Sequence, residues 1–139
     1  MPEQRSPKQR PIDNVIQFIQ NLPSMSHLKP EDYAEVNGLA EQVGKQEIKA
    51  TQLRKIFHYI KDLKRQFQRS GGSFDRAKVA LIMPSLAYAK GRKLIPEEFY
   101  ELLALCFGPQ KCKSFADFES AANFLEAIMA YHKYYHPNA

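Results

Sequence analysis

The sequence predicts an all-α protein, a compact bundle of five to six helices. Apolar residues recur three and four positions apart along most of the chain, which places them on one side of an α-helix. Proline–acid pairs, glycines and a serine capping pattern fall where these periodic segments begin and end. No segment shows the strict alternation of apolar and polar residues that a half-buried β-strand requires.

The length and composition suit one domain. A chain of 139 residues can bury a substantial core. We expect a flexible polar tail over residues 1–10, one helical domain over residues 11–136 and a short tail over residues 137–139. No run of 18 apolar residues is present, and the first residues lack the hydrophobic region of a secretory signal. The sequence therefore predicts a cytoplasmic protein that does not associate with membranes.

Prolines mark the start of the first two predicted helices. A short helix opens at Pro11 and ends before Pro23. The second begins at Pro30, where the following acids favour the positive end of the helix dipole, and continues to Gly44. The residues expected to face the core are Ile12, Val15, Ile16 and Ile19 in the first helix and Tyr33, Val36, Ala40 and Val43 in the second.

A basic amphipathic helix follows. Its predicted N-cap is Thr51, whose hydroxyl can accept a backbone N–H, although Ile48 could also lie inside a longer helix. Lys64 falls among the apolar positions, where its stem lies along the core edge or its ammonium reaches a partner. The spacing separates a buried stripe from a cationic one. The buried stripe comprises Leu53, Ile56, Phe57, Ile60, Leu63 and Phe67, and the cationic stripe comprises Arg54, His58, Lys61, Arg65 and Arg69.

The segment after the glycine-rich turn at residues 70–73 is apolar on nearly every side. This composition over residues 74–91 is typical of a buried helix. Pro84 is expected to kink that helix or divide it in two, since proline lacks the N–H that closes a turn.

Two further helices complete the predicted bundle. One runs from Pro96 to Gly108, and the longest opens at Ser114 with an S-x-x-D capping pattern. The wide apolar and aromatic side of the longest helix predicts either a central position or a subunit contact.

Charge is strongly polarised along the chain. Residues 45–93 hold 13 Lys or Arg and 3 Asp or Glu, a net charge of +10, whereas both flanks are net acidic. A cationic patch of this kind indicates a polyanionic partner such as nucleic acid. The alternative is a helix face that is simply solvated.

Signatures of catalysis are missing from the sequence. It holds no GxxxxGK[ST], GxGxxG, GxSxG or HExxH motif. His132 and His136 have a spacing that can ligate metal, but Pro137 predicts a frayed helix end, and no further ligand lies nearby in sequence. Cys106 and Cys112 cannot build a zinc site alone. We therefore expect no catalytic residues, metal site or cofactor, and a small hydrolase using the two histidines is kept only as an alternative.

The candidate RNA contacts are cations that can bond phosphate oxygens and release counterions, together with one glutamine that can bond a phosphate or a 2′-hydroxyl. Such contacts read backbone shape and carry no sequence preference. Tyr59 and Tyr88 are the aromatic residues interleaved with these cations, and Tyr88 fits a core position better. The candidates are Lys49, Gln52, Arg54, Lys55, Lys61, Arg65, Arg69, Lys90 and Arg92.

Three blocks carry a resemblance to a known family. They are IxxTQLRKIF from Ile48, LxPxLAYAxGR from Leu81 and Fx(5)FxEAxxAYHK from Phe118. In this order and spacing they resemble the small subunit of the type III-A CRISPR-Cas effector, the Csm complex. The second block is the most specific, and residues 45–134 are covered.

The resemblance implies a compact helical protein without a catalytic centre. Copies of such subunits stack beside the backbone subunits that hold the guide RNA and help to hold the guide–target duplex. RNA cleavage in that family belongs to the backbone subunit, and DNA cleavage belongs to the large subunit. Carried onto this sequence, residues 52–55 and the Gly91-Arg92 turn are the candidates for RNA contact.

A DNA-binding regulator is the main alternative. In that hypothesis residues 51–69 form the recognition helix of a helix-turn-helix motif. A regulator discriminates between DNA sequences and dimerises on half-sites, whereas the subunit prefers RNA of any sequence with a steep salt dependence.

Overall fold

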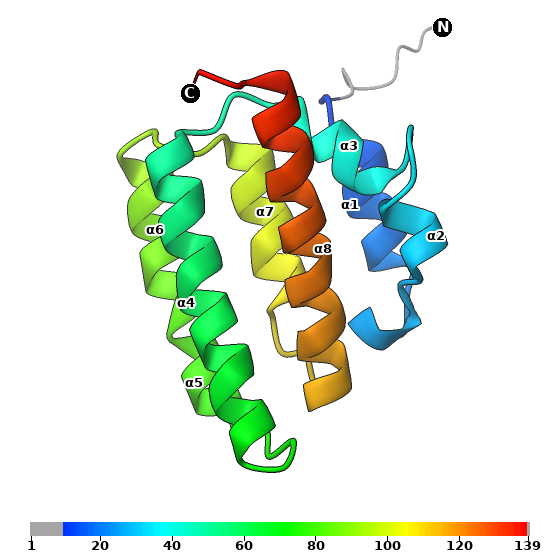
Figure 1. Ribbon diagram of the computed structural model, residues 1–139, viewed down its shortest axis with the longest axis vertical. Helices are drawn as coiled ribbons and strands as arrows, with labels where there is room; N and C mark the ends of the chain where they lie inside the picture. Colours follow the sequence, from blue (N-terminus) through cyan, green and yellow to red (C-terminus); the bar gives the residue numbers. More distant parts are fainter. Residues whose placement is uncertain (1–9, 139) are drawn as a thin grey trace, which may run out of the picture.

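The computed structural model describes residues 10–138 and confirms the all-α class. Its elements are arranged as a bundle (Figure 1), and no strand occurs within the described residues. None of the helices in this range is long and apolar enough to cross a membrane. The elements are α1 (Asp13–Gln20), the 3-10 helix η1 (Met25–His27), α2 (Pro30–Tyr33), α3 (Leu39–Gly44), α4 (Ala50–Arg69), α5 (Arg76–Ala80), α6 (Ile82–Gly91), α7 (Glu97–Cys106) and α8 (Phe115–Tyr135).

The longest helix, α8, lies at the centre of the bundle. It packs against α3, α4 and η1, and Figure 1 shows it between α4 and the group formed by α1, α2 and α3. The buried Phe118 ring of α8 lies 5.3 Å from the Phe67 ring of α4 and 5.6 Å from the Phe107 ring beyond α7, both in edge-to-face arrangements. The central position, one of the two roles predicted for the wide apolar side of this helix, is confirmed.

The start of α8 also anchors the N-terminal region. Ser114 Oγ accepts from the Asp117 N–H at 3.2 Å, as the capping pattern predicts. The buried Asp117 carboxylate accepts from the N–H groups of Ser26 at 2.8 Å and Lys113 at 3.0 Å. Burial by itself would raise the pKa of this carboxyl, but those hydrogen bonds leave it below its usual value.

Arg10 ties the beginning of the described chain to α7. Its guanidinium donates to both carboxylate oxygens of Glu101, at 2.7 and 2.8 Å, and also to Asp13 at 2.9 Å. The bond to Glu101 raises the pKa of Arg10 and lowers that of the carboxyl. Apart from Arg10, the tail predicted over residues 1–10 lies outside the described residues.

The helix predicted from Pro30 to Gly44 is interrupted. It forms α2 and α3, and Val36 in the connection is 74% exposed instead of buried. The connection includes Asn37, whose φ of 69° is a left-handed conformation that asparagine tolerates and that a continuous α-helix cannot contain. The other three residues expected to face the core in this region are buried: Tyr33, Ala40 and Val43.

The predicted N-cap of α4 is wrong, whereas the predicted division of the apolar segment 74–91 is found, three residues before Pro84. The N-cap of α4 is Lys49, and Thr51 is an exposed residue inside the helix. The apolar segment 74–91 divides at Leu81, which is 64% exposed. The division precedes Pro84 because a helix that starts at Ile82 places the proline in its first turn, where an N–H has no intrahelical partner anyway.

Candidate nucleic-acid interface

The basic helix α4 buries one side and exposes a row of cations on another. Its buried residues are Leu53, Ile56, Ile60, Leu63 and Phe67, while Phe57 is half-buried. We call the predicted cationic stripe the α4 crest. All of its members are exposed: Arg54, His58, Lys61, Arg65 and Arg69.

Most of this charge is not neutralised within the described part of the chain. Between residues 10 and 138, the only ion pair of α4 within 4.0 Å joins Arg65 Nη1 to Asp62 Oδ1 at 3.2 Å, and both side chains are largely exposed. An exposed pair one turn apart is weak and screened by salt. The crest therefore keeps a net positive charge that can attract phosphates.

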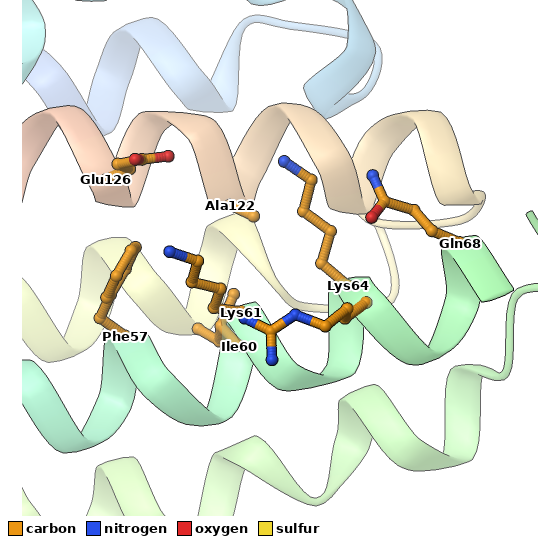
Figure 2. A pocket seen from close by; sticks show the side chains of 8 residues that line it. Phe57, Ile60, Lys61, Lys64, Gln68, Ala122 and Glu126 are labelled. Atoms are coloured by element: carbon orange, nitrogen blue, oxygen red, sulfur yellow. The ribbon is translucent and has the colours of Figure 1, made fainter.

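One edge of the crest borders a small hollow between α4 and α8. Figure 2 shows Lys61 and Lys64 pointing from α4 towards α8, where Glu126 lies. Lys64 Nζ donates to Asn123 Oδ1 at 3.0 Å, so its ammonium crosses to α8. The hollow, of about 120 Å³, is lined by three cations and one carboxylate, and it remains positive.

A larger groove lies between α4 and α6, which run antiparallel (Figure 1). We call it the α4–α6 groove, and its volume is about 440 Å³. Two hydrogen bonds join α4 and its N-cap to the segments on either side of α6: Lys49 N–H donates to Leu94 O at 3.1 Å, and Tyr59 Oη donates to Lys78 O of α5 at 3.4 Å. Its lining comprises Gln52, Lys55, Ile56, Tyr59, Ile82, Pro84, Ser85, Leu86 and Tyr88.

Two tyrosines expose their rings along this groove. Tyr59 is 43% exposed and Tyr88 is 60% exposed, so the core position preferred for Tyr88 is wrong. Arg92 holds the Tyr88 ring, because its Nη1 donates to Tyr88 Oη at 2.6 Å and its guanidinium lies 5.6 Å from the ring centroid. Sequence reasoning named Tyr88 but preferred the core for it, and it missed Ser85, because a helix that is apolar all round does not reveal which side stays open.

The predicted site residues fall on distinct surfaces. Lys90 lies over the Tyr100 ring of α7 at 5.2 Å, away from the α4–α6 groove. Lys49 is exposed at the N-cap of α4 and is not among the residues that line the groove. Gln52 and Lys55 line the groove, and Arg92 contacts Tyr88 at its wall. The remaining candidates belong to the α4 crest: Arg54, Lys61, Arg65 and Arg69.

The two histidines considered as metal ligands, His132 and His136, lie at the C-terminal end of α8 and line neither the hollow nor the groove. The His132 and His136 rings are 4.5 Å apart, and His136 Nε2 lies 3.2 Å from the carbonyl oxygen of Lys45. Burial lowers the pKa of His132, and the neighbouring His136 adds to this effect. Among the described residues, no group of three or more His, Cys, Asp or Glu side chains could hold a metal ion.

One comparison with known proteins identifies a family. A family model described as Csm2 Type III-A matches residues 30–138, which is most of the chain. No curated protein and no solved structure matches the sequence.

Proposed function

The chain belongs to the Csm2 type III-A family, the small subunits of the type III-A CRISPR-Cas Csm complex, and we propose that it binds RNA there without catalysing a reaction. Several copies stack beside the backbone subunits and contact the large subunit. Each copy holds the guide–target RNA duplex through phosphate and sugar contacts, in cytoplasmic antiviral defence.

The α4 crest is the observation that carries this proposal. Arg54 and Arg69 lie 15 residues apart on one helix, which corresponds to about 22 Å. Guanidinium and ammonium groups bond phosphate oxygens and release counterions along such a path. Because the crest lies on an exposed, convex helix face, it touches the RNA backbone and not the base edges, and it therefore binds without sequence preference.

The state of the two thiols supports a non-catalytic role. Cys106 and Cys112 are buried, and burial raises the pKa of both, that of Cys112 to about 12. A thiol in this condition is protonated at neutral pH and is a poor nucleophile. Neither thiol therefore offers a nucleophile for covalent catalysis.

Reconstitution of the complex tests the proposal. A tagged chain, expressed with the other Csm subunits and a guide RNA, is expected to purify with both and to be needed for target-RNA retention. The purified chain alone, incubated with RNA and with Mg²⁺, Mn²⁺ or Zn²⁺, is expected to leave the RNA intact. Metal-dependent cleavage, or binding to one DNA sequence with a half-site footprint, would contradict the proposal and favour one of the two alternative functions.

A further inference from the structure

We propose that the α4–α6 groove holds unpaired bases of an RNA strand whose phosphates contact the neighbouring cations. This inference deepens the proposed RNA-binding function and rests on it. It assigns to the protein a second kind of contact, with bases instead of phosphates.

The dimensions of the groove suit small flat groups. Its volume of about 440 Å³ falls within the roughly 300–1,000 Å³ of ligand-binding pockets. Gln52 and Tyr59 are seven residues apart on α4, about 10 Å along the groove. That length accommodates more than one base along the groove, but a space of this size between two helices does not admit a duplex.

The exposed groups of the groove match the chemistry of nucleobases. Tyr59 and Tyr88 offer aromatic rings, and base–aromatic stacking tolerates any base because every base has a π-face. The Gln52 amide and the Ser85 hydroxyl each provide a donor and an acceptor for base edges. The Arg92 hydrogen bond fixes the Tyr88 ring before a ligand arrives, which lowers the entropy lost on binding.

Charge indicates RNA as the occupant in preference to a partner helix. The described residues that line the groove include Lys55 and no Asp or Glu, and Arg92 lies against the wall. Lys55 follows Arg54 directly, so neighbouring residues of one helix serve the groove and the crest. A strand whose phosphates run over the crest can therefore place bases in the groove while its backbone remains in cationic surroundings.

The test uses short single-stranded RNA that contains 2-aminopurine, whose fluorescence is quenched when the base stacks. The variants are Tyr59→Leu and Tyr88→Leu, which keep an apolar side chain and remove the ring. The matched control is Tyr134→Leu, which changes a tyrosine that is 74% exposed on α8 and does not line the groove. Tyr88→Phe keeps the ring, and circular dichroism checks the fold of each variant.

Each groove variant is expected to weaken single-strand binding about 5- to 150-fold, the loss of one stacked base. In the same variants the quenching of 2-aminopurine should disappear, while their affinity for duplex RNA stays within about two-fold of that of the unmodified protein. Tyr134→Leu should retain both quenching and single-strand affinity. Tyr88→Phe should retain quenching and lose less affinity than Tyr88→Leu, because it keeps the ring and loses only the hydrogen bond from Arg92.

The results separate this inference from the proposed function. If Tyr59→Leu and Tyr88→Leu bind and quench like the unmodified protein while Arg54→Ala with Lys61→Ala weakens binding, the groove inference fails and the crest remains. If the tyrosine variants keep RNA affinity but no longer assemble with Csm subunits, the groove holds protein and the inference is overturned. If only the tyrosine variants lose affinity, the groove inference stands and the crest proposal fails.

Discussion

Replacing Arg54 and Lys61 together by alanine removes two crest cations and leaves the buried side of α4 untouched. The two residues are seven positions apart, about 10 Å along the same side of the helix. Neither forms an ion pair within residues 10–138, and alanine is the strongest helix former. The double variant is therefore expected to fold normally and to lose only its interaction with RNA phosphates.

The expected loss follows from counterion release. Each phosphate contact with single-stranded nucleic acid contributes a slope of about −0.7 to log K against log salt, so two lost contacts reduce the slope by about 1.4. If the variant and the unmodified protein bind equally at about 1 M salt, this difference in slope corresponds at 0.15 M salt to a loss of roughly 14-fold in affinity. At 0.5 M salt it shrinks to roughly 3-fold, because each counterion released into more concentrated salt gains less entropy.

The assay is the anisotropy of a fluorescently labelled RNA titrated with protein at several salt concentrations. The control variant is Lys29→Ala with Lys113→Ala, which removes the same charge from exposed positions outside α4 and α6. We expect the control to keep a slope close to that of the unmodified protein. Parallel plots for the crest variant and the unmodified protein would refute the assignment of RNA phosphates to the crest.

Three further predictions concern the fold. Leu86→Ala should lower the free energy of unfolding by about 2–5 kcal/mol because the Leu86 side chain is fully buried. Leu81→Ala, at an exposed position, should change the free energy of unfolding little. Urea denaturation measures both variants, and equal losses would contradict the burial of Leu86 in α6. Gly44→Ala should lower the free energy of unfolding by about 1–3 kcal/mol, because the added Cβ would lie 2.7 Å from Tyr131 Cβ and 2.8 Å from His132 N. In the control Gly91→Ala the added Cβ meets open space, so the same assay should show no change. Burial lowers the pKa of His132, so the unfolded state binds more protons than the folded state. Stability should therefore fall as the pH drops below about 6.5 and level off below the pKa of the folded state. Thermal melts of His132→Gln should depend less on pH, and an unchanged pH dependence would show that His132 is not its source.

Features confined to one helix were predictable from the sequence. The buried stripe of α4 and the exposure of Arg54, Lys61 and Arg65 follow from the helical period alone, whatever α4 packs against. The same holds for the Ser114 cap, because the donor and the acceptor are three residues apart.

Features that depend on how helices pair were not predictable. Segment 74–91 is apolar on nearly every side, so its periodicity could not show that Tyr88 faces a groove. The interruption between α2 and α3 includes a left-handed backbone conformation at Asn37, and a periodic apolar pattern across residues 33–43 conceals it. The groove itself exists only because the chain turns after α4 and brings α6 back alongside it.

The neighbouring positions of Arg54 and Lys55 bear on what one copy of the subunit contributes to RNA recognition. Adjacent residues of a helix point about 100° apart, so Arg54 faces outward on the crest while Lys55 lines the groove. Phosphates occur on single strands and duplexes alike, and the crest alone therefore gains affinity from both. Unpaired bases are offered only by a strand that is not fully paired, so the groove adds affinity in that case alone. On the proposal that both surfaces bind RNA, they together favour RNA with accessible bases and leave the choice of sequence to base pairing by the guide.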